Sequence, residues 1–257
     1  MSAALSCLAA GGAAFAAGLV NAVAGGGTLI SFPTLVALGV PAIASNITNT
    51  VALCPGYFGG TFAQRDELRA QRQGLPWLLA AAAAGGLTGS ILLVCTSEGL
   101  FRGVVPFLIL LASALLGLQG VIKQRLGGRE APPERPSATG RGHSVALGLA
   151  VFAGAVYGGY FGAGLGIMLL AVLGLTGRGS LAQQNAVKQA LSLTVNVVAA
   201  LFFAFSRKVY WQLAAVMAGA SLLGGNLGGH LASRLNPTIL RAVVVLLGVA
   251  VAVKFWL

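Results

Sequence analysis

Long uncharged stretches alternate along the chain with short segments that carry the basic residues. The first charged side chain is Arg65, and further uncharged windows span residues 73–97, 103–122, 142–177, 189–206 and 209–233. A bilayer core about 30 Å thick is crossed by roughly 20 apolar residues of helix, so the windows are long enough for one or more crossings. The pattern predicts an all-α fold, a polytopic transmembrane helical bundle.

Composition and charge agree with this prediction. Of 257 residues, 57% are hydrophobic and 8% are charged, whereas a soluble domain carries roughly 25% charged residues. The formal net charge of +11 is a feature that nucleic-acid-binding proteins share. Here, however, the basic residues flank the apolar windows, as in loops that obey the positive-inside rule. We therefore expect the lipid bilayer to surround the protein, and no nucleic acid to bind it.

Like residues recur along the chain at one fixed spacing. Pairs that differ by 139 positions include Gly25/Gly164, Asn46/Asn185 and Arg102/Arg241. Since 257 − 139 = 118, residues 1–118 pair with residues 140–257. The segment between them, 119–139, is basic and rich in proline, which indicates a cytoplasmic linker. The sequence thus predicts two transmembrane repeats.

Each repeat contains the same series of predicted elements. A glycine break separates a first apolar helix from a short apolar piece, and a polar-striped helix, a Gly-rich helix and a final helix follow. In the first repeat these elements span 4–24, 28–39, 42–63, 75–96 and 101–122, and in the second 143–160, 167–176, 181–206, 210–231 and 238–256. Duplicated membrane domains with paired broken helices are a common plan among transporters.

The number of crossings is open. With four crossings per repeat the two repeats are parallel, and with a fifth contributed by the short piece they are inverted. Both arrangements place the same excess of basic residues inside, so the positive-inside rule does not choose between them. The short pieces are too short to cross a membrane alone, which favours four crossings and a half-helix per repeat.

The two glycine breaks are candidate binding segments for an anion. Glycine lets the chain leave helical geometry, and the N–H groups at the start of a short helix attract negative charge. Close helix packing is the alternative reason for such glycines. The candidates are Asn21, Gly25, Gly26, Gly27 and Thr28 in the first break, and Tyr160, Gly162, Gly164 and Gly166 in the second.

A polar stripe follows each break. At about 100° per residue, its members share one helix face: Asn46, Asn49, Thr50, Leu53 and Tyr57 in the first repeat, and Asn185, Lys188, Gln189, Ser192 and Asn196 in the second. Polar side chains within a span usually face a cavity or the bundle interior. Asn and Thr can equally join helices, and Lys188 can extend to the membrane interface. The position equivalent to Lys188 in the first repeat is the neutral Asn49, so a site between the repeats would hold one net positive charge.

The sequence contains no arrangement of residues that is typical of an enzyme active site. The five acidic residues lie in loops or at helix edges, and the three cysteines lack metal-type spacing. Ser221 and His230 are nine residues apart on one helix and face opposite sides, which excludes a catalytic dyad. No dinucleotide, phosphate-loop or metalloprotease motif occurs. We expect no enzyme activity, cofactor or metal.

Two segments resemble a known family. GLVNAVAGGGTLISFPTLVALGVPAIASNITNT (18–50) is similar to the first signature of the TauE/SafE sulfite exporter family, and GAVYGGYFGAGLGIMLLAVLGL with AQQNAVKQ (154–189) is similar to the second. The resemblance implies an inner-membrane, multi-pass permease of sulfite, organosulfonates or similar anions, mostly exporters. The bulky Tyr160-Phe161 where the first repeat has Asn21-Ala22 is a departure from simple symmetry.

We therefore expect a secondary transporter that exposes a midplane site between the repeats alternately to each side. Its substrate would be a small sulfur-containing oxyanion bound by the break amides, the two stripes and Lys188. An anion channel and a membrane scaffold without transport activity are the alternatives. A homodimer is compatible with the sequence.

Overall fold

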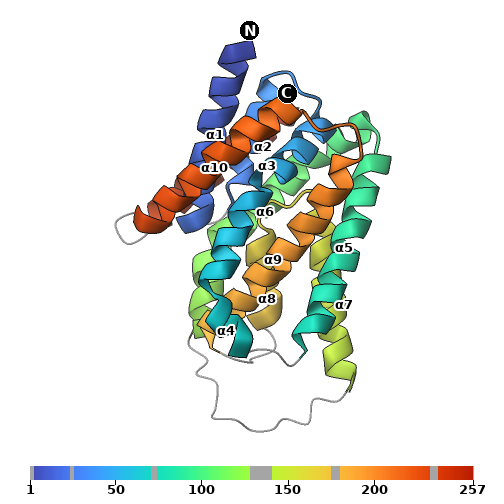
Figure 1. Ribbon diagram of the computed structural model, residues 1–257, viewed down its shortest axis with the longest axis vertical. Coiled ribbons are helices and arrows are strands. Elements are labelled where there is room, and N and C mark those ends of the chain that lie inside the picture. Colours follow the sequence, from blue (N-terminus) through green and yellow to red (C-terminus); the bar gives the residue numbers. More distant parts are fainter. Residues whose placement is uncertain are drawn as a thin grey trace.

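The computed structural model describes residues 3–23, 26–70, 74–127, 141–174, 180–231 and 237–256. These residues form α-helices and no strand. The helices are α1 (Ala3–Val23), α2 (Thr28–Ala37), α3 (Ala42–Ala63), α4 (Arg65–Ala70), α5 (Leu75–Cys95), α6 (Glu98–Gly127), α7 (Arg141–Tyr160), α8 (Leu165–Gly174), α9 (Leu181–Ala204), α10 (Trp211–Leu231) and α11 (Pro237–Trp256). Figure 1 shows them as an elongated bundle.

The predicted all-α membrane fold is confirmed. Five of the described helices, α1, α5, α6, α9 and α11, are long and apolar enough to cross a membrane. Three more, α3, α7 and α10, have 22, 20 and 21 residues. The short helices α2 and α8 have 10 residues each. The protein is therefore polytopic, with two short helices among the long ones.

Two boundaries differ from those predicted. Helix α6 continues to Gly127, so the first part of the predicted 119–139 linker is helical, and residues 128–139 lie outside the described residues. The basic segment after α3 contains the short helix α4, in which Arg69 lies 3.6 Å from Asp66. Both additions are polar helical turns at a helix end, which a search for apolar windows does not detect.

Two helix pairs at opposite sides of the bundle correspond to each other in sequence. Helix α1 packs along α10 at one side, and α5 packs along α7 at the other (Figure 1). A shift of 139 residues relates α1 to α7 and α5 to α10, so it exchanges one pair for the other. Two of the central pairs, α3 with α9 and α6 with α11, join a helix to its own counterpart. This packing is what a duplication would produce, and the duplication itself stays a prediction.

The counterparts α3 and α9 run in opposite directions. Gln64, which follows α3, accepts a hydrogen bond from Asn185 near the start of α9 (2.7 Å). Near the start of α3, Thr48 accepts from the N–H of Tyr210, which follows α9 (3.1 Å). Helices α6 and α11 are also antiparallel, because Gly120 borders Arg241 and Ser113 borders Gly248.

The two counterpart pairs thus run antiparallel, as they would in inverted repeats, although the length of the short pieces favoured the parallel arrangement. The physical reason is the course of the short helices. Leu38 and Gly39, just after α2, line the same recess as Ser6 and Cys7 near the start of α1. Helix α2 thus returns the chain to the end where α1 begins, and this extra passage reverses the direction of every later element.

Glycines allow the peripheral pairs to approach at backbone contact. A Cβ on Gly18 of α1 would overlap the carbonyl oxygen of Ser221 on α10, and one on Gly89 of α5 would overlap the carbonyl oxygen of Val156 on α7. In a bilayer, where lipid is as apolar as the side chains, such close packing is a main source of helix association.

An aromatic cluster holds α2 in place near the second break. The ring of Phe32 lies edge-on to that of Phe161 at 5.5 Å and to that of Phe101 at 6.5 Å, and it stacks with that of Phe255 at 6.4 Å. Phe161 belongs to the segment between α7 and α8. The cluster therefore ties the short helix of one repeat to the break of the other.

Candidate functional site

The first glycine break lies between α1 and α2. Gly26 has φ 86°, a left-handed conformation that favours glycine. The Asn21 side chain accepts a hydrogen bond from the N–H of Gly27 at 3.0 Å, which closes the turn. A Cβ on Gly27 would overlap the carbonyl oxygen of Ala17. The predicted break is confirmed at these residues, and Gly25 lies outside the described residues.

The second glycine break lies between α7 and α8. Gly162 has φ 79° and Gly164 has φ 77°. The Tyr157 hydroxyl donates to the carbonyl oxygen of Ala163 at 2.6 Å. Among the described residues, the N–H groups of Ala163, Gly164 and Gly166 have no hydrogen-bond partner. Gly166 itself lies in the first turn of α8, so these donors cluster at the start of that helix.

Both breaks pack against the middle of α6. The Cβ position of Gly26 is 2.9 Å from Leu116, and that of Gly164 is 3.5 Å from Ala112. Leu116 and Ala112 are one helical turn apart on α6. The fold therefore brings the two irregular segments, which are far apart in sequence, to neighbouring positions inside the bundle. Irregular backbone at membrane depth requires either such burial in protein or a polar cavity.

The stripe on α3 forms interhelical hydrogen bonds. Asn49, which is 2% exposed, accepts from the hydroxyl of Ser31 at 2.5 Å and donates to that of Thr28 at 3.4 Å. Asn46 donates to the carbonyl oxygen of Tyr160 at 2.8 Å, and Thr50 donates to the carbonyl oxygen of Asn46. Asn49 thus joins α3 to α2, and Asn46 joins α3 to the second break, so the packing role weighed for these side chains is present.

The stripe on α9 brings a cation to the start of α8. The Lys188 side chain runs beside Gly166, with its Cδ 3.7 Å from the Cβ position of that glycine, and the Ser192 hydroxyl oxygen lies 4.0 Å from the same point. The Lys188 ammonium donates to the Asn185 carbonyl oxygen at 2.8 Å. Asn185 in turn donates to Gln64. Lys188 is therefore half-buried, with its charge directed one turn toward the start of α9.

Ser192 is the clearest unsatisfied donor of this group. Its side chain is 1% exposed, and its hydroxyl has no hydrogen-bond partner among the described residues. A buried hydroxyl without a partner is unfavourable by about 1–3 kcal/mol. Together with the N–H groups of Gly164 and Gly166 and the Lys188 ammonium, it forms a set of donors suited to an oxyanion.

Tyr57 connects the two repeats. Its side chain interacts with those of Asn21 of α1 and Asn196 of α9, and Asn196 donates to the carbonyl oxygen of Ser192 at 2.8 Å. Thr61, one turn further along α3, donates to the main-chain carbonyl oxygen of Gln189. The two stripes therefore face each other across the α3–α9 contact.

Tyr160 contributes its backbone rather than its ring. Its hydroxyl lies 3.4 Å from that of Thr96 and its ring packs 5.8 Å from that of Phe101, whereas its carbonyl oxygen accepts from Asn46. The bulky ring of Tyr160, which departs from the symmetry between the repeats, thus packs near the end of α5 and the start of α6.

Several polar residues of the region were not predicted. Thr61 and Gln64 continue the Asn46–Tyr57 stripe at the same spacing, so extending the helical pattern by two turns would have found them. Ser31 is fully buried but lies on the short apolar helix α2, where the sequence gives no periodic signal.

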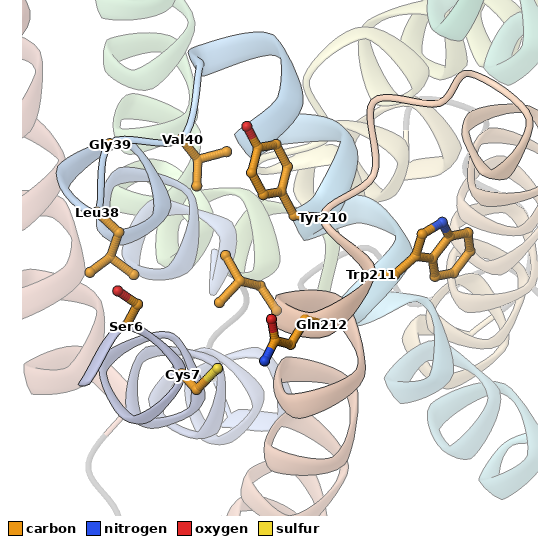
Figure 2. Close-up of a pocket in the computed structure, with 9 residues that line it drawn as sticks. Ser6, Cys7, Leu38, Gly39, Val40, Tyr210, Trp211 and Gln212 are labelled. Atoms are coloured by element: carbon orange, nitrogen blue, oxygen red, sulfur yellow. The ribbon is translucent and has the colours of Figure 1, made fainter. Parts of the chain in front are cut away.

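A surface recess of about 450 Å³ lies apart from these residues. Figure 2 shows it between the start of α1, the α2–α3 connection and the start of α10. Its lining comprises Ser6, Cys7, Leu38, Gly39, Val40, Tyr210, Trp211, Gln212 and Leu213. None of these was predicted to bind substrate. The lining has no charged side chain, so the α3–α9 region is the better candidate for an anion.

Comparison with known proteins decides the family. A model of the family described as "Sulfite exporter TauE/SafE" matches residues 10–255. The chain belongs to the TauE/SafE sulfite exporter family. It is therefore a membrane transporter of the TauE/SafE type, and the resemblance seen in the sequence is confirmed.

Named relatives agree with this assignment. The chain is 28% identical over 243 residues to a "Probable membrane transporter protein" of Haemophilus influenzae, which covers 93% of this chain and 90% of that protein. It is 27% identical over 247 residues to the "Probable membrane transporter protein YfcA" of Escherichia coli strain K12, which covers 94% of this chain and 86% of that protein. No solved structure matches the chain.

Proposed function

We propose that this TauE/SafE transporter exports a small sulfur-containing oxyanion, such as sulfite or an organosulfonate, across the inner membrane. The supporting observation is the donor set at the start of α8. The N–H groups of Gly164 and Gly166 lie at the start of α8, and the Ser192 hydroxyl and the aliphatic part of the Lys188 side chain approach Gly166 from α9. Such groups replace the hydration shell of an oxyanion without requiring a metal or a cofactor.

Binding is asymmetric between the repeats. In the first repeat the residue at the position of Lys188 is Asn49, whose side-chain oxygen and nitrogen both bond to α2. In the second repeat the equivalent contacts are absent among the described residues, because α8 has Ile167 and Leu170 where α2 has Thr28 and Ser31. The first repeat thus provides the rigid wall, and the second provides the charge.

Transport would proceed by alternating access. The antiparallel course of α3 and α9 supports this proposal, because inverted repeats around a midplane site recur among secondary transporters. The two breaks against α6 mark the position of that site. Movement of one repeat relative to the other would expose the anion first at the linker end of the bundle and then at the recess end.

Sulfite flux into proteoliposomes tests the proposal. Purified protein should give saturable sulfite flux that sulfonates and thiosulfate inhibit by competition. Electrical recording distinguishes the nearest alternative, because a channel would conduct continuously without saturating at low concentration. Purified, folded protein that moves none of these anions would contradict the substrate assignment, and a scaffold function would then gain support.

The Ser192 hydroxyl provides a specific prediction. Ser192→Ala should raise the KM for sulfite severalfold, since one hydrogen bond to an anion is lost, while the thermal stability should stay the same or rise, because the substitution removes a buried hydroxyl that has no partner among the described residues. Thr194→Ala is the matched control on the same helix, because its hydroxyl is already bonded to the carbonyl oxygen of Ala190 at 2.9 Å. Equal KM values for wild type and Ser192→Ala would remove Ser192 from the site.

A further inference from the structure

Two further buried polar groups lie outside both stripes, one on α6 and one on α11, helices that pack against each other. Gln119 of α6 is 8% exposed, and its side-chain oxygen has no partner among the described residues. On α11, the Arg241 Nε is buried and also lacks a partner within that part of the chain. The guanidinium borders α6, with Nη1 3.5 Å from the Cβ position of Gly120. A guanidinium has five N–H donors, so acceptors are missing here.

This group lies one helical turn from the first glycine break. Leu116 precedes Gln119 by three residues, Val244 follows Arg241 by three, and both approach the Cβ position of Gly26, at 2.9 and 3.7 Å. Because α6 ends at Gly127 and α11 begins at Pro237, Arg241 lies on the linker side of the break. It therefore occupies the region between the linker end of the bundle and the candidate midplane site.

Comparison with the first repeat explains why Arg241 lacks a carboxylate. Its counterpart at a spacing of 139 is Arg102, which lies 3.7 Å from Glu98 and whose side chain is 59% exposed. The counterpart of Glu98 is Pro237, since 98 + 139 = 237. The second repeat thus has the cation without the neighbouring anion, and buries part of it. The buried Nε of this half-buried cation is a donor that an anion from elsewhere could satisfy.

We infer that Arg241 and Gln119 form a second oxyanion subsite, which binds the transported anion on the linker side of the first break. This inference rests on the proposed function. The planar guanidinium can donate two parallel hydrogen bonds to an oxyanion. The Gln119 carbonyl oxygen can accept from Arg241 while its amide nitrogen donates to the same anion. A lipid phosphate has the same oxyanion chemistry, and the test below separates the two sources.

The test measures sulfite KM separately from each side of the membrane, in oriented vesicles of phosphatidylcholine alone and of phosphatidylcholine with phosphatidylglycerol. Arg241→Gln should raise the KM for sulfite presented at the linker side about tenfold and leave the KM from the other side unchanged. Arg241→Lys keeps the positive charge but cannot donate two parallel hydrogen bonds, and it should give an intermediate KM for sulfite. Arg102→Gln is the matched control and should behave as wild type.

The outcomes are distinct. An unchanged linker-side KM in Arg241→Gln overturns the inference, as does an effect that occurs only with phosphatidylglycerol, because Arg241 would then bind a lipid phosphate. Absence of sulfite flux in wild type would contradict the proposed function instead. In that case thermal unfolding decides: stabilisation by sulfite that Arg102→Gln keeps and Arg241→Gln loses supports the subsite, and no stabilisation of the wild type overturns it.

Discussion

Replacing Lys188 by Gln should reduce sulfite flux by roughly 10- to 150-fold, which corresponds to the 1.5–3 kcal/mol typical of a hydrogen bond to a charged group. Lys188 is the cation that borders the start of α8, and its side chain contacts Gly166. The substitution should raise the KM for sulfite and lower the maximal rate, because the Lys188 charge stabilises the bound anion both before and while the site changes from one side of the membrane to the other. Flux of radiolabelled sulfite into proteoliposomes measures it.

Two further variants make this prediction specific. Lys188→Arg should retain part of the flux, because it retains the positive charge. Lys208→Gln removes another lysine, one that donates to the carbonyl oxygen of Val94 at 3.4 Å near the recess end, and should leave flux unchanged. If folded Lys188→Gln transports as fast as wild type, Lys188 only extends toward an interface, and binding must rest on the break amides.

The second large effect concerns stability. Gly18→Ala should destabilise the protein by about 1–3 kcal/mol, the usual range for overpacking, because the added Cβ overlaps the backbone of Ser221 and approaches that of Gly225 on α10. Both contacts are backbone atoms, which cannot rotate away. Thermal unfolding in detergent should show a lower midpoint.

Gly12→Ala is the matched control for this substitution. It lies on the same helix, and nothing lies within 4 Å of its Cβ position. It should leave the midpoint unchanged or raise it slightly, since alanine favours a helix more than glycine does. If the two substitutions have equal effects, the close α1–α10 contact does not determine stability.

Much of the architecture could be predicted because it depends on local pattern. Helix α3 spans residues 42–63 as expected, since apolar windows and the glycine and proline positions determine where helices begin and end. Helical spacing likewise predicted that the members of each stripe share one face of their helix. By contrast, the antiparallel direction of α3 and α9 depends on the course of α2, and both the parallel and the inverted arrangement satisfied the same charge rule.

The site was predictable in part for similar reasons. Asn21, Tyr57 and Asn196 meet as side chains of the predicted set, and the positive φ values of Gly26 and Gly164 lie in the predicted breaks. Gly166 lies within a helix rather than in the break. Arg241 was assigned to a membrane edge by charge alone, and its burial against Gly120 depends on the antiparallel contact of α6 and α11, which no local pattern contains.

The most direct test of the central claim is the position of the bound anion. Selenite is a close analogue of sulfite, and its selenium atom can be located by anomalous X-ray diffraction from crystals of the purified protein. The account predicts a selenium peak at the start of α8, with selenite oxygens within hydrogen-bonding distance of the Ser192 hydroxyl and the Lys188 ammonium. A peak only in the recess near Trp211, with none between α8 and α9, would contradict it.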